Sequence, residues 1–415
     1  INSLLRFANT VDYGVPATDL TWAAGSITSG LPGVPWNVEI NDAGTDLQLF
    51  DTRSLRGSIS ITNGTFTLMP AYTGSFSLGG NWTRTGASSA FVHNNKKVVF
   101  DRQSAGNQTI TVGSSVTAEN FYDLEFSPVN GNVVLGSSSS INVTNSLTFV
   151  TGKLDLAASG NTLTLGTTSS NGTLSGYGAS AYIISNGGLF KRFTNTNTTY
   201  VYPVGDASNY TPMDLTLSNG AQSTSFVTCK VSSSTHVNIG TSTNYISRFW
   251  SLEPTGLASS PVYDVAYTYA ASDVVGPAAN LYPTKYSSLG WIASPGSSAN
   301  AIDGTSASHN VGTRTFSWGG ITTFSDFTGA GNGSPLPVEL LSFTANVNSN
   351  QTVQLQWTTA SETNNSHFIV EKSINALDYT FLGRVQGSGT SSMMHSYNLE
   401  DANPFEGISY YRFTQ

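Results

Sequence analysis

The sequence predicts an all-β protein in which a right-handed parallel β-helix, or solenoid, is followed by two antiparallel β-sandwich domains. Three observations support this fold class. Short strands of alternating apolar residues recur about every 22 residues in the first half of the chain. Longer strands replace them near residue 215, and a run rich in glycine and proline at 331–337 precedes a new apolar segment. Helical signals are nearly absent, because no long window has convincing i, i+3, i+4, i+7 spacing.

The repeating strands have inward positions that recur one coil later, as a β-helix requires. We expect three strands per turn, each stacking its inward residues on those of the coil below. Antiparallel hairpins also give short strands at regular spacing, but they do not require similar patterns to recur. The recurring pairs are Phe126 and Phe149, Leu135 and Leu156, and Val143 and Leu165, which lie 23, 21 and 22 residues apart.

The chain divides into three predicted domains and a linker. Strand length increases after the first domain, and these longer strands contain Trp and Tyr, which is typical of a sandwich. The linker combines glycine and serine with Pro335 and Pro337. The predicted parts are the β-helix at 1–215, a β-sandwich at 216–330, the linker at 331–337 and a second sandwich at 338–415.

The last domain has the pattern of a fibronectin type III-like sandwich. Six strands fall within about 78 residues, with an early Trp357 and a late pair at Tyr410 and Tyr411. One further strand would follow "ISYYRFTQ" in a complete seven-stranded sandwich. We therefore expect this domain to lack its last strand.

Several segments of the chain resemble one class of bacterial surface protein. "LPVELLSFTA", "VQLQWTTASETNNSHFIVEKS" and "YNLEDANPFEGISYYRFTQ", between Leu336 and Gln415, closely resemble the module that precedes the C-terminal sorting domain in large proteins exported by the type IX secretion system. The upstream "YVYPVGDASNYTPMDL" and "ISRFWSL" resemble the stalk and junction of the same class. The resemblance implies an adhesin at the outer cell surface, with a parent chain that continues beyond Gln415 into a sorting domain.

Composition and charge exclude several other classes. Only 10% of the 415 residues are charged, and the net charge of −8 is scattered, so no basic stripe exists for nucleic acid. No run of 18 apolar residues exists, which excludes a transmembrane segment of helical type. The single cysteine, Cys229, excludes an internal disulfide, and its alternating neighbours predict a small buried apolar residue.

Paired carboxylates are the one arrangement that suggests catalysis. The five histidines share no motif, and no nucleophile elbow, P-loop or dinucleotide fingerprint occurs. Parallel β-helices often carry polysaccharide lyases and hydrolases, and glycoside hydrolysis needs two nearby carboxyl groups. Asp101 and Asp123 are 22 residues apart, one predicted coil, and Glu125 lies beside them. We interpret them as solvated charges at strand ends, with a catalytic set as the alternative.

A calcium site is the alternative to a polar turn in "NDAGTDLQLFD". Its oxygen ligands would be Asn41, Asp42, Asp46 and Asp51, but the spacing of the twelve-residue calcium loop is absent. We predict a polar turn and no cofactor.

Four tyrosines cluster near the predicted end of the β-helix. Tyr177, Tyr182, Tyr200 and Tyr202 could stack on sugar rings or cover the open last coil. We favour a hydrophobic cap, because an uncovered sheet edge invites pairing with other chains.

Together these observations predict a non-catalytic extracellular surface protein, an adhesin or structural stalk exported by a type IX secretion system. Its partners would be that secretion machinery and an extracellular ligand such as a glycan or matrix protein. One alternative is a β-helix enzyme that degrades polysaccharides. Another is self-association into a filament, in which Ile1–Val11 adds a strand to the open edge of another copy's last domain.

Overall fold

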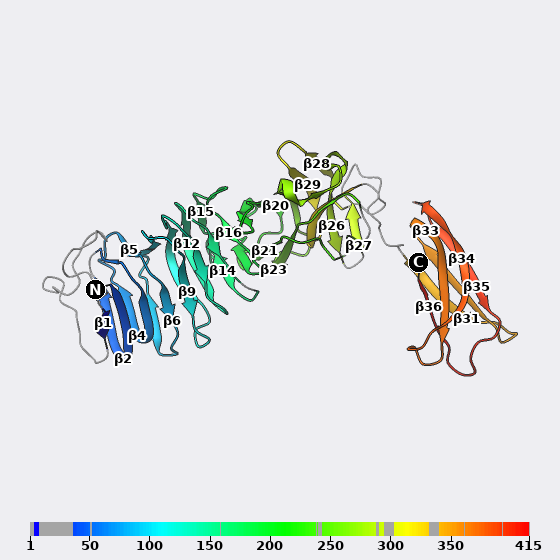
Figure 1. Ribbon diagram of the computed structural model, residues 1–415, viewed down its shortest axis with the longest axis horizontal. Coiled ribbons are helices and arrows are strands. Elements are labelled where there is room, and N and C mark those ends of the chain that lie inside the picture. Colours follow the sequence, from blue (N-terminus) through cyan, green and yellow to red (C-terminus); the bar gives the residue numbers. More distant parts are fainter. Residues whose placement is uncertain are drawn as a thin grey trace.

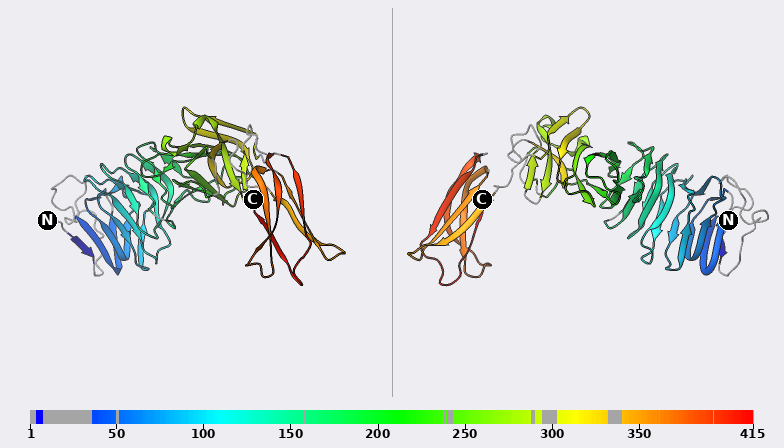
Figure 2. Two further views of the ribbon diagram at one scale, coloured as in Figure 1. Left: turned by 45° about the vertical axis from the view of Figure 1, so that its right-hand side comes forward. Right: turned by 180° about the vertical axis from the view of Figure 1, so that it is seen from behind.

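The structure, a computed structural model, describes residues 4–7 and 36–414 except 50–51, 158, 238, 240–242, 288–289, 294–302, 332–339, 361 and 392. Helical structure in this part of the chain is limited to two 3-10 turns, η1 (Ala271–Asp273) and η2 (Ala278–Asn280). Figures 1 and 2 show a parallel solenoid, then antiparallel sheets, then a further pair of sheets, in chain order. The all-β prediction is confirmed.

The solenoid has about seven turns over residues 38–205. Every strand pair within it is parallel, and two sheets run along its length. The first sheet contains β1 (Leu4–Phe7), β2 (Asn37–Leu49), β4 (Ile59–Leu68), β6 (Trp82–Arg84), β7 (Ser89–Val92), β9 (Gln108–Val112), β11 (Val133–Leu135), β13 (Leu154–Asp155), β16 (Ile183–Ile184) and β19 (Val204–Gly205). The parallel part of the second contains β3 (Ser54–Leu55), β5 (Ser75–Leu78), β8 (Lys97–Phe100), β10 (Glu119–Phe126), β12 (Ser140–Phe149), β14 (Thr162–Leu165), β15 (Thr173–Ser175) and β17 (Leu189–Phe193).

The register of the coils follows the predicted period. Phe126 lies opposite Phe149, and Val143 lies opposite Leu165. β11 and β13 pair with the 21-residue offset expected from Leu135 and Leu156, since Val133 lies opposite Leu154. Long strands bend, so that one half of β12 pairs with β14 and the other half with β15. Each of these coils therefore has three straight segments, as predicted.

Inward side chains stack coil upon coil to form the solenoid core. The rings of Phe100, Phe126 and Phe149 follow one another with centroids 6.0 and 5.5 Å apart. Residues of this kind are fully buried, and aromatic rings at such distances add to the hydrophobic stabilisation from burial. Because like side chains stack on like, a period near 22 residues is sufficient to specify the register.

The second sheet continues from the solenoid into antiparallel structure. β17 pairs antiparallel with β21 (Phe226–Ser232), with Phe190 opposite Cys229. The resulting sheet has 15 strands. Its other members are β22 (Tyr245–Ile246), β23 (Phe249–Thr255), β25 (Val274–Val275), β26 (Leu281–Ser287), β27 (Gly290–Ala293) and β30 (Asp326–Gly331).

A five-stranded antiparallel sheet packs against this extension. Tyr267 from that sheet contacts Trp250 and Phe327 from the extension, with ring centroids 5.0 and 5.9 Å apart. The strands run in the order β18 (Thr199–Tyr202), β20 (Met213–Asn219), β24 (Val262–Thr268), β29 (Thr315–Ile321) and β28 (Ser306–Asn310). The parallel pairing ends at Gly205, and residue 215 lies inside β20.

The C-terminal part consists of two three-stranded antiparallel sheets with a core of their own. Trp357 and Phe368 are buried at its centre. The six strands expected from the sequence are all present, and β36 pairs with β33 on one side. Most of the predicted linker, from residue 332 onward, lies outside the described residues. The strands are β31 (Leu340–Val347), β32 (Val353–Thr359) and β35 (His395–Asp401) in one sheet, and β34 (Thr380–Ser391), β33 (Glu362–Ser373) and β36 (Tyr410–Thr414) in the other.

Candidate binding groove

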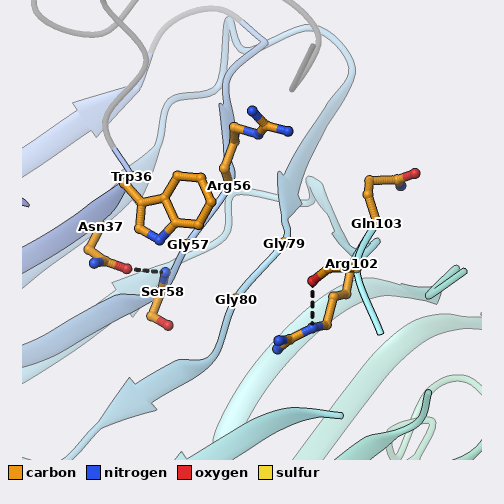
Figure 3. Close-up of a pocket in the computed structure, with 10 residues that line it drawn as sticks. Trp36, Asn37, Arg56, Gly57, Ser58, Gly79, Gly80, Arg102 and Gln103 are labelled. Atoms are coloured by element: carbon orange, nitrogen blue, oxygen red, sulfur yellow. Dashed lines mark hydrogen bonds between the residues drawn. The ribbon is translucent and has the colours of Figure 1, made fainter. Parts of the chain in front are cut away.

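A groove of about 310 Å³ runs along one corner of the solenoid, across four successive coils. Figure 3 shows Trp36 and Arg56 on one side, Arg102 and Gln103 on the other, and glycine backbone between them. Neighbouring strands in a sheet are about 4.8 Å apart, so four coils span roughly 14 Å. The lining residues are Trp36, Asn37, Arg56, Gly57, Ser58, Gly79, Gly80, Arg102, Gln103 and Ser104.

Three glycines form the floor because the stacked corners leave no room for a side chain. A Cβ on Gly57 would lie 2.1 Å from the carbonyl oxygen of Trp36, and one on Gly80 would lie 2.2 Å from the carbonyl carbon of Gly57. A Cβ on Gly79 would lie 2.6 Å from the carbonyl oxygen of Arg56. Glycine permits this close approach of backbone to backbone. The floor is therefore flat and made of peptide groups.

Polar side chains connect the corners of neighbouring coils. The Ser58 N–H donates to Asn37 Oδ1 at 2.7 Å, and the Asn81 N–H donates to Ser58 Oγ at 2.9 Å. The next coil repeats the arrangement, since the Thr109 N–H donates to Asn81 Oδ1 at 2.9 Å. These bonds satisfy backbone donors where the strand ladder is interrupted. They hold the lining residues in register along the axis.

A fully buried amide supports the groove from within the solenoid. Gln108 Nε2 donates to the carbonyl oxygens of Leu78 and Gly80 at 2.7 and 2.8 Å, and its Oε1 accepts from the Arg102 N–H at 3.1 Å. One side chain thus connects the floor at Gly80 with the wall at Arg102. Such a satisfied buried network makes the local backbone rigid.

The walls of the groove are positively charged. The Arg56 guanidinium lies 5.7 Å from the ring centroid of Trp36, whose side chain is 37% exposed. Arg102 is oriented by bonds from Nε to Ser104 Oγ at 3.2 Å and from Nη1 to the Asn107 carbonyl at 2.9 Å. Within the described residues neither arginine forms an ion pair, and no lining residue is acidic. A chain with a net charge of −8 therefore has a local site suited to anions.

The predicted catalytic carboxylates lie on the second sheet, outside this groove. Asp123 and Glu125 are on β10, and Asp101 directly follows β8. Glu125 Oε2 is 2.9 Å from Lys97 Nζ. Asp123 Oδ1 accepts from Asn145 Nδ2 at 2.7 Å and also from the hydroxyl of Ser146. Two of the three carboxylates are thus engaged with partners from neighbouring strands.

Asp101 has a different environment. Burial raises its pKa to about 6, and the negative charge of Glu125 adds to the increase. Its Oδ1 is buried and has no hydrogen-bond partner among the described residues. A carboxyl group that stays protonated near neutral pH can act as a general acid. Asp101 is therefore the member of the predicted set with an unusual chemical property.

The predicted calcium ligands bind their own turn and the next coil. Asn41 Oδ1 accepts from Asn63 Nδ2 at 3.0 Å, and Asp42 Oδ2 accepts from the Gly44 N–H at 3.2 Å. Asp46 Oδ1 accepts from Thr67 Oγ1 at 2.7 Å. Asp51 lies outside the described residues. No group of three or more His, Cys, Asp or Glu that could hold a metal occurs in the described part of the chain.

The tyrosine cluster lies at the end of the solenoid, where the antiparallel sheets begin. Tyr182, Tyr200 and Tyr202 are buried, and Tyr177 packs partly buried against the same core. The Tyr202 hydroxyl donates to the Val227 carbonyl at 2.9 Å. These rings cover the last coil and are not available for stacking on a sugar. Cys229, on the neighbouring β21, is also buried, as predicted.

The proposed donor strand lies at the opposite end of the chain. Within Ile1–Val11 the structure describes Leu4–Phe7, which form β1 and pair in parallel with Asn37–Ile40 of β2. This segment therefore serves as an additional rung at the N-terminal end of the solenoid. Strand donation from here would use residues that already have a partner within their own chain.

A second groove, of about 410 Å³, crosses the outer face of the five-stranded sheet. Two carboxylates, Asp214 and Asp264, line it among Thr, Ser and Ala side chains. Burial raises the pKa of Asp214, and Asp264 Oδ1 accepts from the Gly320 N–H at 2.8 Å. Its lining contains no cation, so its charge is opposite to that of the corner groove.

Comparisons of the chain with protein-family models, curated proteins and solved structures gave no match. Among the helices in the described part of the chain, none has the length and apolar character needed to cross a membrane.

The sequence analysis did not identify the corner groove, although part of its signal is present. Gly57 and Gly79 lie one period apart, and each is next to an arginine or a second glycine. A search for recurring corner residues, in addition to recurring apolar residues, would have found the floor. The spacings of Trp36 and Arg102 from this repeat are irregular, because the connecting loops differ in length.

Proposed function

We propose that this chain is a non-catalytic extracellular surface protein, an adhesin or stalk that binds its ligand along the solenoid. The observation that carries this proposal is the chemistry of the corner groove. Two arginines, one tryptophan and a floor of backbone groups can bind a ligand, but the lining contains no acid, base or nucleophile for cleaving one.

The architecture supports a load-bearing role. The strand ladder passes from solenoid to antiparallel sheet at Phe190 and Cys229 without interruption, so the two parts are connected by backbone hydrogen bonds. In this proposal the coils are right-handed, which is the usual hand of parallel crossover connections. The two C-terminal sheets are a fibronectin type III-like module, and export uses a type IX secretion system, as the sequence resemblance implies.

Surface location is tested by labelling intact native cells with an antibody against residues 36–331. We expect labelling in cells with an active type IX secretion system and its loss when that system is inactivated. Intracellular accumulation of the chain in both strains would contradict the proposal. The absence of turnover is tested separately, by incubating the purified chain with polysaccharides and measuring new reducing ends and unsaturated products.

A polysaccharide-degrading enzyme is the second candidate, and Asp101 is the observation that favours it. Its pKa of about 6 beside a second carboxylate is a property shared with catalytic acids. Cleavage that is lost in Asp101→Asn and in Glu125→Gln would establish this candidate. Cleavage that both variants retain would indicate a different site or a contaminating enzyme.

A further inference from the structure

We infer that the corner groove formed by Trp36, Arg56 and Arg102 binds an acidic polysaccharide. The carboxylate or sulfate groups of the polymer bind the two guanidinium groups, and a sugar ring packs against the indole. This inference names the ligand class for the binding role proposed above and rests on that role.

The charges of the groove select for an anionic ligand. A guanidinium group presents a planar set of donors that matches carboxylate and sulfate oxygens in a bidentate manner. Other cations of the chain have acidic partners, for example Lys97 with Glu125 and Lys285 with Asp303. Arg56 and Arg102 have none within the described residues, so their charge remains available to a ligand.

The shape of the groove selects for a polymer. It follows the solenoid axis over four coils, a distance of roughly 14 Å, which exceeds one sugar ring. Its floor at Gly57, Gly79 and Gly80 has no side chains, so an extended chain can lie across it. The indole of Trp36 adds an apolar ring face at one end, and aromatic rings of this kind bind the C–H face of sugars.

The groove is also organised before a ligand arrives. Arg102 is held by Ser104 and Asn107, and the backbone on both sides is tied together by Gln108. Arg56 lies against the Trp36 ring. Less conformational entropy is lost on binding when the recognition groups are already in place.

Binding is tested with the purified chain and three polymers at physiological salt. Polygalacturonate supplies carboxylates and dextran sulfate supplies sulfates, while dextran is the neutral counterpart of dextran sulfate. We expect binding to one or both acidic polymers and none to dextran. The double variant Arg56→Gln with Arg102→Gln should weaken binding about tenfold or more, since two charge-assisted contacts are lost.

The matched control is Lys96→Gln with Lys230→Gln, which removes the same charge from partly exposed positions outside the groove. We expect this control to bind within about twofold of the original chain. A second double variant, Arg56→Lys with Arg102→Lys, keeps the charge but removes the planar donors, and should bind with intermediate affinity.

Equal weakening in the glutamine groove variant and the control would overturn the inference, since binding would then follow net charge alone. Full binding by the lysine groove variant would overturn recognition by guanidinium groups. Absence of binding to both acidic polymers would overturn the ligand class while the surface role, tested by cell labelling, would stand. Each variant is first compared with the original chain by circular dichroism, so that misfolding is recognised.

Discussion

Arg248 Nη2 lies 2.5 Å from Asp206 Oδ2, and this ion pair joins the end of the solenoid to the antiparallel sheets. Asp206 directly follows β19, the last parallel strand, whereas Arg248 directly precedes β23. The same guanidinium donates from Nε to Asp273 Oδ2 at 2.6 Å. Arg248 is 1% exposed, so it neutralises two carboxylates at the junction in a place where water has little access.

Replacing Arg248 with methionine should destabilise the junction strongly. The change leaves Asp206 and Asp273 without their shared cation, and breaking a buried ion pair costs about 3–5 kcal/mol of unfolding free energy. The measurement is urea unfolding followed by tryptophan fluorescence. Arg412→Met is the matched control, because the Arg412–Glu371 pair is exposed and should contribute little. Equal losses in the two variants would contradict a special role for the junction.

The same ion pair should make stability sensitive to acid. Burial raises the pKa of Asp206, but hydrogen bonds from Arg248, Ser208, Asn209 and Ser233 outweigh this effect and hold the pKa well below its usual range. A carboxyl group with a depressed folded pKa contributes stability above its unfolded pKa of about 3.9 and loses it as the pH falls below that value. Unfolding free energy should therefore decline below about pH 4, and less steeply in Asp206→Asn. An unchanged slope in that variant would contradict the assignment.

Asp101 should show the opposite dependence on pH. Its folded pKa of about 6 is raised, so the folded state binds the proton more tightly than the unfolded state between about pH 4 and pH 6. Its contribution to stability is therefore lost as the pH rises through this window. Asp101→Asn should stabilise the chain by about 1–2 kcal/mol at pH 7.5, allowing for partial exposure of the side chain, and by less at pH 4.5. Thermal unfolding at both pH values measures this, and destabilisation at pH 7.5 would contradict it.

The glycine floor should not tolerate a methyl group. A Cβ at Gly80 would meet the backbone of Gly57 at 2.2 Å, so Gly80→Ala requires a backbone shift that costs about 1–3 kcal/mol. Gly178→Ala is the matched control, because a Cβ there has nothing within 4 Å. Thermal unfolding of both variants tests the difference. If Gly80→Ala were as stable as the control, the close contact between the corners would be wrong.

The C-terminal sheets should unfold as a separate unit. Their core around Trp357 and Phe368 shares no buried apolar residue with the core of the solenoid and antiparallel sheets. Trp357→Ala should lower one calorimetric transition, at a cost of about 3–5 kcal/mol, and leave the other at its original temperature. A shift of both transitions would show that the two cores are energetically coupled.

The sequence by itself determined the fold of the repeating region. Phe126, Phe149, Val143 and Leu165 recur at one period, and stacking like residues in a parallel ladder buries all of them at once. The near absence of helix and the burial of Cys229 follow from the same local alternation. These features could be predicted because each depends on a pattern that repeats along the chain.

Only the tertiary structure decided the rest. Trp36, Arg56 and Arg102 are separated by 20 and 46 residues, and they meet because loops of unequal length return the chain to the same corner. The pairing of Phe190 with Cys229, and the ion pair between Arg248 and Asp206, depend on a single antiparallel turn-back that no repeat announces. An apolar period specifies register because burial is favourable at every coil, whereas polar corners and junctions arise from contacts that occur once.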